Sequence, residues 1–147
     1  MWYTVSAKNK RRATGHAGPP PAPTGAGGKR LPAIFFRTSA GGEPVREWLK
    51  SLPREDRRRI GEDIKTVEFG WPVGMPVCRP MGSGLFEVRS RLASNRIGRV
   101  LFYIDGKSRM VLLHGFVKKT QRTANDDLEL AKANMNIHRQ DLERGRK

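Results

Sequence analysis

Apolar residues recur along the first half of the chain at spacings that predict one strand and two helices. Residues 33–37 form a short β-prone run. Spacing of i, i+3, i+4 and i+7 then predicts a first helix, with Val45, Trp48, Leu49 and Leu52 on one side. A second helix carries Ile60, Ile64 and Val67. Pro53 separates the two helices, and Gly70 and Pro72 end the second.

The second half of the chain changes to the patterns of β-strands. Residues 85–91 alternate, which puts Phe86 and Val88 on one side and Glu87, Arg89 and Arg91 on the other. The nearly continuous apolar runs 99–104 and 110–117 are typical of interior strands. Asp105-Gly106 between them predicts a hairpin. Residues 71–84, rich in Pro and Gly, predict a loop.

A C-terminal helix follows these strands. Residues 123–126 match a capping box in which Thr123 caps the helix. The helix carries one stripe, formed by Ala124, Leu128, Ala131, Met135, His138 and Leu142. The order of elements predicts a small α+β domain with an antiparallel sheet, two N-terminal helices and a C-terminal helix. We expect the helices to pack on one sheet face and to leave the other face or its rim open.

Residues 1–32 differ in composition from the rest of the 147-residue chain. They contain no acid, six Lys or Arg residues, and a cluster of Pro, Gly and Ala. Such a segment cannot bury enough apolar surface to order itself, so we expect a disordered basic extension before a folded domain at 33–147. The extension is either a nucleic-acid-binding arm or a dispensable leader.

Positive charge is concentrated in one segment of the folded domain. The chain carries a formal net charge of +15, and residues 79–122 hold ten Lys or Arg against two acids, Glu87 and Asp105. The flanking segments 43–78 and 123–147 are each neutral. A sheet with this much uncompensated charge repels itself, which indicates a polyanionic partner, RNA or DNA.

Strand alternation predicts which of these residues lie together. A two- or four-residue hairpin loop would put Arg99, Leu101 and Tyr103 on one face with Met110, Leu112, His114, Phe116 and Lys118. The four-residue loop would set Arg99 opposite His114. Arginines suit phosphate because their planar fork stays charged, while His114 or a lysine crowded by cations could move protons. Each residue also has a simpler explanation without a ligand. His114 would pack in the core, Lys118 and Lys119 would keep the strand end soluble, and Arg89 and Arg91 would be ordinary charges of an edge strand.

Two stretches resemble RelE/HigB-type toxins of type II toxin–antitoxin modules, within the RelE/ParE superfamily and especially its phage-derived group. They are residues 85–91 with 99–103, and residues 110–123, in which "LLHGF-x-KKT" precedes the C-terminal helix. The resemblance covers residues 33–137. It implies a metal-independent, ribosome-dependent mRNA endoribonuclease that inhibits translation, with no cofactor. Its partners would be the ribosome, mRNA and a cognate helix-turn-helix antitoxin.

The resemblance aligns Arg89, Arg99, and Lys118 or Lys119 with the cationic site of the family, and the charge pattern of the strands adds the other candidates. The predicted catalytic residues are Arg89, Arg99, Lys119 and His114, and the predicted RNA-binding residues are Arg91, Arg96, Lys118 and Arg122. The late catalytic tyrosine of RelE has no counterpart, because no Tyr follows Tyr103. The base is therefore either Lys119 or His114.

Other features narrow the class of protein. A single cysteine, Cys78, indicates a reducing, cytoplasmic location, and three histidines with one cysteine form no recognisable metal-ligand pattern. No run approaches the ~20 apolar residues of a membrane span. Two alternatives to the nuclease remain, a ParE-like toxin that poisons DNA gyrase and a non-enzymatic nucleic-acid-binding module.

Overall fold

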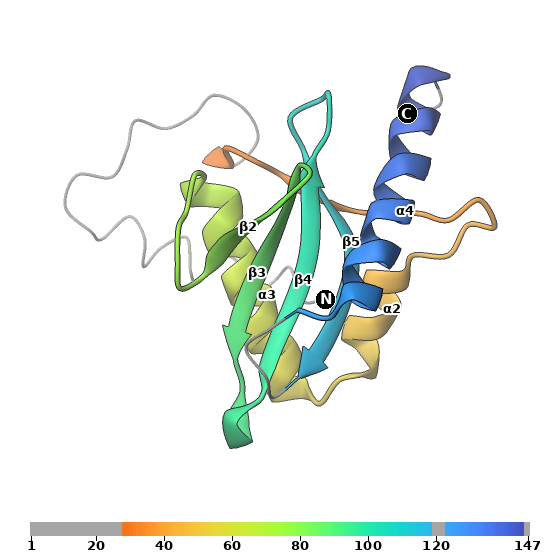
Figure 1. Ribbon diagram of the computed structural model, residues 1–147. Helices are drawn as coiled ribbons and strands as arrows, with labels where there is room; N and C mark the ends of the chain where they lie inside the picture. The colour runs from red at the N-terminus through yellow and green to blue at the C-terminus, as the bar shows by residue number, and fades with distance from the viewer. Residues whose placement is uncertain (1–27, 119–122, 146–147) are drawn as a thin grey trace.

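The computed structural model describes residues 28–118 and 123–145 and shows one mixed sheet with three helices (Figure 1). The elements are β1 (Ala33–Phe35), α2 (Pro44–Ser51), α3 (Arg54–Gly70), β2 (Cys78–Gly82), β3 (Leu85–Arg91), the 3-10 turn η3 (Ala93–Asn95), β4 (Ile97–Ile104), β5 (Met110–Lys118) and α4 (Asn125–Glu143). The strand order is β1-β5-β4-β3-β2. The predicted α+β class is confirmed. The sheet is not purely antiparallel, because β1 joins its edge parallel to β5.

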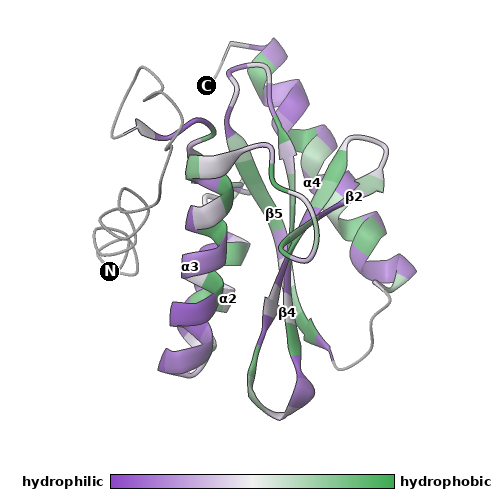
Figure 2. Ribbon diagram, turned by 90° about the vertical axis from the view of Figure 1, so that its left-hand side faces the viewer, coloured by the Kyte–Doolittle hydropathy of each residue, from purple (hydrophilic) through white to green (hydrophobic). Residues whose placement is uncertain are grey.

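The helices lie in two layers, one on each side of the sheet. Figure 2 shows α2 and α3 on one side and α4 on the other. The expectation that all helices share one face is therefore wrong for α4. Its stripe is responsible, because Ala131 and Met135 pack against Leu101, Tyr103 and Phe116 in a second apolar core. Helix α4 packs mainly on β5 and β4, and the β3 residues Leu85 and Glu87 are also buried on this face.

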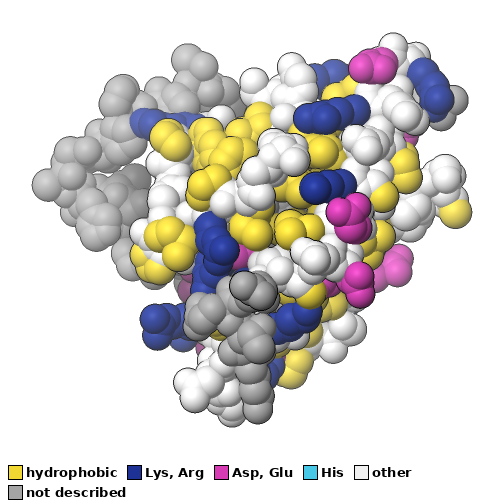
Figure 3. All heavy atoms as spheres, in the orientation of Figure 1, with side chains coloured by type: hydrophobic (Ala, Val, Ile, Leu, Met, Phe, Trp, Pro, Cys, Tyr) yellow, Lys and Arg dark blue, Asp and Glu magenta, His cyan; other side chains and the backbone are white. Residues whose placement is uncertain are grey.

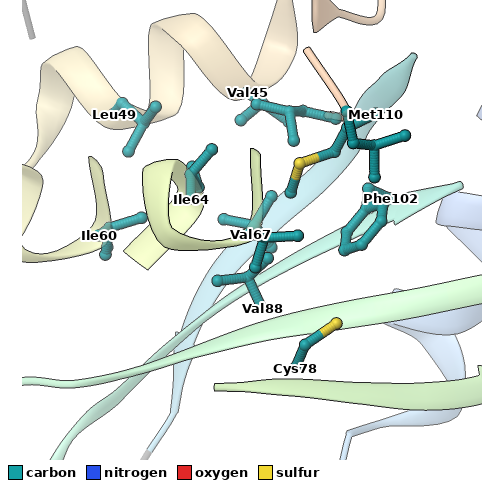
Figure 4. Packing of buried hydrophobic residues seen from close by; sticks show 12 residues of the cluster. Val45, Leu49, Ile60, Ile64, Val67, Cys78, Val88, Phe102 and Met110 are labelled. Atoms are coloured by element: carbon teal, nitrogen blue, oxygen red, sulfur yellow. The ribbon is translucent and has the colours of Figure 1, made fainter. Parts of the chain in front are cut away.

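The first core fills the space between the sheet and the α2–α3 pair (Figure 4). In that view Leu49 and Val45 of α2 and Ile60, Ile64 and Val67 of α3 face Val88, Phe102 and Met110 of the sheet. Cys78 lies at the sheet side of this core and is 1 % exposed. Burial raises the pKa of its thiol to about 11, so Cys78 packs as an uncharged side chain at neutral pH.

Strand β2 lies inside the segment that was predicted to be a loop. It pairs with β3, and Pro80 stands opposite Phe86. A proline lacks the N–H that a sheet requires, but an edge strand tolerates it, and β2 is an edge strand. The Pro- and Gly-rich composition hid this strand. It matters because β2 brings Arg79 opposite Glu87.

The β4–β5 hairpin forms at Asp105-Gly106 as predicted, but its register differs. Ile104 pairs with Met110, which leaves an odd number of connecting residues and turns Met110 and Leu112 toward the first core. A bulge at Leu113 then restores the alternation, so His114 and Phe116 return to the face of Arg99. Arg99 consequently lies opposite Phe116, and not opposite His114.

The folded domain includes residues 28–32, which were assigned to the N-terminal extension. Leu31 is 2 % exposed in the first core. Lys29 Nζ lies 3.1 Å from Glu68 Oε2 on α3, and the Met110 N–H donates to the Pro32 carbonyl at 2.8 Å. Residues 29–32 therefore pack with the folded domain.

Deleting residues 1–32 is expected to lower the free energy of unfolding by about 2–4 kcal/mol, because the Leu31 side chain leaves a cavity in the core. Urea unfolding of the two truncated proteins, without 1–32 and without 1–27, measures this difference. The shorter deletion is the matched control and keeps the contacts of Leu31 and Lys29. Equal stability of the two proteins would show that the contacts of Leu31 and Lys29 do not stabilise the domain.

Candidate nucleic-acid interface

Cationic side chains occupy three neighbouring rows across the sheet, on the face that α4 partly covers. The central row is Arg89, Arg99 and Phe116, on β3, β4 and β5. One flanking row holds Arg79, Glu87, Leu101 and His114, and the other holds Arg91, Ile97 and Lys118. Residues opposite one another on neighbouring strands point to the same side about 5 Å apart, so the rows form one surface.

Figure 3 looks onto this face. Lys and Arg side chains lie over β3 and toward the end of β5, while most of the Asp and Glu side chains seen in this view lie at the side of α4. Among the described residues, the three rows contain five Lys or Arg side chains, with Glu87 within the rows and Asp127 beside them. The surface therefore keeps an excess of positive charge.

Arg89 lies nearly buried within this surface. Its side chain is 10 % exposed, and its Nη1 lies 3.7 Å from Glu87 Oε1. Burial lowers the pKa of Arg89, and the charges of Arg99, Arg79 and Arg91 lower it further, whereas Glu87 opposes them. The guanidinium remains charged at neutral pH and lies among three other arginines, with the Glu87 carboxylate beside it. This concentration of guanidinium groups is suited to an anionic ligand.

Arg99 lies beneath this surface in a buried polar network. Its side chain is 0 % exposed, and its Nη1 donates to Thr123 Oγ1 at 3.0 Å and lies 3.4 Å from Glu87 Oε1. The Thr123 hydroxyl in turn donates to Glu87. Arg99 thus joins β3, β4 and the chain just before α4. Since its side chain is covered, Arg99 does not present its guanidinium at the surface.

This network also explains why Thr123 does not cap α4. The helix begins at Asn125, its N-cap is Ala124, and no side chain caps it. The capping-box prediction is therefore wrong. The Thr123 hydroxyl is engaged by Arg99 and Glu87, which provide a charged partner in a buried position.

A second polar cluster joins β5 to the first turn of α4. Asp127 Oδ1 lies 2.7 Å from His114 Nε2, and Asp127 Oδ2 lies 3.1 Å from Lys118 Nζ. Burial acts to raise the pKa of Asp127, but hydrogen bonds from His114 and Lys118 outweigh it and lower the pKa. The His114 ring also stacks on Phe116, with centroids 5.3 Å apart. The carboxylate and the ring together fix the orientation of the imidazole.

Arg96 lies outside the three rows and is held by α3. Its guanidinium pairs with both carboxylate oxygens of Asp56 on α3, at 2.8 and 3.1 Å. The hydrogen bond with Asp56 raises the pKa of Arg96. Arg91 is exposed on the surface, and Lys118 is 36 % exposed. Lys119 and Arg122 lie outside the described residues, so their predicted roles stay predictions.

Three residues of the surface were missed from the sequence: Arg79, Thr123 and Asp127. Arg79 stood in a predicted loop, and no pattern placed it on a strand. Asp127 follows Thr123 by four residues, which is about one helical turn. This spacing was the one sequence signal that the two side chains lie on the same side of the chain. Tyr103 packs at the other end of β4, where its hydroxyl lies 2.7 Å from His138 Nδ1. Burial is the main cause that raises its pKa to about 12.

The surface offers two kinds of chemistry, phosphate binding by arginines and proton transfer by an oriented histidine. No three His, Cys, Asp or Glu side chains within the described ranges are grouped as ligands for a metal ion. Likewise, none of the helices described is long and apolar enough to cross a membrane.

The architecture is consistent with a RelE-like fold: a mixed five-stranded sheet with two helices before it and one C-terminal helix. The chain belongs to the Gp49-like family of phage-derived proteins, whose family model matches residues 47–136. That family is generally associated with toxins of toxin–antitoxin modules of the RelE/HigB-like kind. The matched segment contains Arg79, Arg89, Arg99, His114 and Asp127. No curated protein matches the chain.

Proposed function

We propose that this protein is the toxin of a type II toxin–antitoxin module and acts as a metal-independent, ribosome-dependent mRNA endoribonuclease. The observation that carries the proposal is Arg89, a nearly buried arginine surrounded by Arg79, Arg91 and Arg99 on a sheet face. Such a site favours a dianionic or polyanionic ligand over a neutral one. Because the chain belongs to a toxin-associated family, we take the ligand to be a phosphate of RNA.

Cleavage of RNA by its own 2′-hydroxyl requires positive charge around the phosphorus. The accessible arginines, Arg79 and Arg91, would hold the phosphate oxygens of the bound strand, with Lys118 at the adjoining edge. Arg89 would contact the phosphate at which charge develops, and Arg99 would stabilise that charge from beneath as a positioning residue. This division modifies the predicted role of Arg99, because its guanidinium is covered.

The reaction also requires a group that removes the proton of the 2′-hydroxyl. We assign this role to His114, because Asp127 binds its Nε2 and leaves Nδ1 to exchange the proton. The alternative base, Lys119, lies outside the described residues. A histidine held by a carboxylate is pre-oriented, so the proton transfer needs no reorganisation of the ring.

The proposed partners follow from this activity. They are the ribosome, the mRNA codon in its A site, and a cognate antitoxin with a helix-turn-helix domain, and the location is the cytoplasm. No small-molecule cofactor is needed for the proposed reaction.

The test combines purified protein with translating ribosomes and a defined mRNA, and maps the cut sites by primer extension. The wild type is expected to cut mRNA on the ribosome. Arg89→Ala is expected to reduce the rate by about 100-fold or more, because it removes a charged contact made to the transition state. His114→Gln is expected to reduce it by a similar factor, because glutamine cannot accept the proton.

Arg54→Ala is the matched control, since Arg54 begins α3 on the opposite side of the sheet. It should cleave like the wild type, and circular dichroism should show all variants folded. Loss of gyrase supercoiling with intact mRNA would favour the ParE-like alternative. RNA binding with neither effect would favour a non-enzymatic module. A folded Arg89→Ala protein that cuts at the wild-type rate would reject the proposed site.

A further inference from the structure

A pocket of about 570 Å³ lies beside the C-terminal end of β3. At this end β3 is no longer paired with β2, whose first residue, Cys78, pairs with Val88. Helix α3 contributes Arg59 and Asp63 to its lining, and the segment before β2 contributes Met75. The turn between β3 and β4 contributes Leu92. Arg89 and Arg91 also line it, so the pocket adjoins the cationic surface.

One part of this pocket holds two neighbouring polar groups, Asp63 and Ser90, which make few polar contacts with the described part of the chain. Asp63 is half-buried and, among the described residues, forms no direct ion pair with a Lys or Arg. Burial raises the pKa of Asp63, while the nearby Ser90 hydroxyl and Arg59 charge act in the opposite direction. Ser90 is 1 % exposed, and its Oγ has no well-formed hydrogen bond within the described part of the chain. Buried polar groups of this kind are costly unless water or a ligand forms hydrogen bonds with them.

The rest of the lining provides positive charge and apolar contacts. Arg59 and Arg91 are exposed, and neither pairs directly with a carboxylate within the residues described. Arg96 also lines the pocket, but its guanidinium is held by Asp56. Met75, an exposed apolar side chain, and Leu92 supply surfaces on which a flat ring could lie. One pocket therefore combines a hydrogen-bond acceptor, apolar surfaces and cations.

We propose that this pocket binds a guanine nucleotide, with the base edge on Asp63 and the phosphate on Arg59 and Arg91. Guanine presents two adjacent donors, N1–H and the N2 amino group, which match the two oxygens of a carboxylate. Uracil presents one donor between two acceptors and would leave one carboxylate oxygen unpaired. Because Arg89 and Arg91 are shared with the cationic surface, the nucleotide would be a residue of the bound RNA next to the cleaved phosphate. The position of the nucleotide next to the cleaved phosphate rests on the proposed function. Binding of a guanine nucleotide to the pocket does not depend on it.

Calorimetric titration of the full-length protein with 5′-GMP, 5′-UMP and inorganic phosphate tests the binding. GMP is expected to bind about tenfold or more tightly than UMP. Asp63→Asn should abolish this difference, and Arg59→Ala should weaken both nucleotides. Glu62→Gln is the matched control on the same helix, since Glu62 pairs with Arg58 and does not line the pocket. Equal binding of GMP and inorganic phosphate, or no binding, would overturn the inference.

Cleavage experiments separate this inference from the proposed function. If GMP competes with mRNA cleavage and Asp63→Asn alters base preference at the cut site, the pocket reads a nucleotide of the RNA. If GMP binds through Asp63 without competition, the ligand is a free nucleotide. If the wild type cleaves mRNA but neither binds GMP nor changes preference in Asp63→Asn, the pocket inference fails and the nuclease stands. GMP binding through Asp63 without any cleavage would reject the nuclease and keep the pocket.

Discussion

Replacing Glu87 with glutamine is expected to lower the free energy of unfolding by about 3–5 kcal/mol. The carboxylate is 0 % exposed and faces both Arg99 and Arg89. Glutamine keeps the volume but removes the charge, so two cations remain in a buried or nearly buried position without their shared carboxylate. Urea unfolding followed by circular dichroism measures the loss.

Two further variants identify the cause. Glu129→Gln removes a carboxylate whose side chain is 73 % exposed, and its effect should be within about 0.5 kcal/mol. Combining Glu87→Leu with Arg99→Met should recover most of the stability, because an apolar pair of similar volume can replace a buried ion pair. If Glu87→Gln unfolds like the wild type, the buried network contributes little to the fold.

Replacing Gly115 with alanine is expected to destabilise the protein by about 1–3 kcal/mol. A Cβ at this position would lie 2.4 Å from Trp48 Cε3 and 2.5 Å from Trp48 Cζ3, so the indole of α2 would have to move. Thermal unfolding of the variant measures the effect. The glycine between His114 and Phe116 is thus explained by close packing of α2 on β5.

Gly106→Ala is the control for this substitution. A Cβ there has no atom within 4 Å, so the change should be nearly neutral. In a Trp48→Leu background, Gly115→Ala should cost less than in the wild type, because the smaller side chain leaves room. Equal costs in the two backgrounds would show that the indole is not the obstacle.

Patterns with a clear period predicted the elements well. The spacing of Val45 and Leu49 predicted α2, and the alternation around Val88 predicted β3, because burial of one side determines both patterns. Strand β2 was missed because an edge strand can hold Pro80 and glycine, which argue against a strand in general. The side of α4 was missed because a stripe shows that a helix is buried, but not against which face.

The candidate site shows a similar division. Alternation correctly put Arg89 and Arg99 on one face, since they pair directly. The pairing of β5 with β4 depends on a bulge at Leu113. The position of this bulge could not be predicted, because no local sequence pattern identifies it. The depth of Arg99 could not be predicted either, because its cover comes from Glu87 and Thr123, which lie 12 and 24 residues away in sequence.

The contact of Glu87, Arg99 and Thr123 links three positions on separate elements, with Glu87 and Thr123 36 residues apart. A substitution at one of them leaves polar groups of the other two buried without that hydrogen-bond partner. During divergence of the family, single substitutions in this trio should therefore be disfavoured. The three side chains are expected to be inherited together or exchanged together, which aligned sequences of Gp49-like proteins would record as correlated variation.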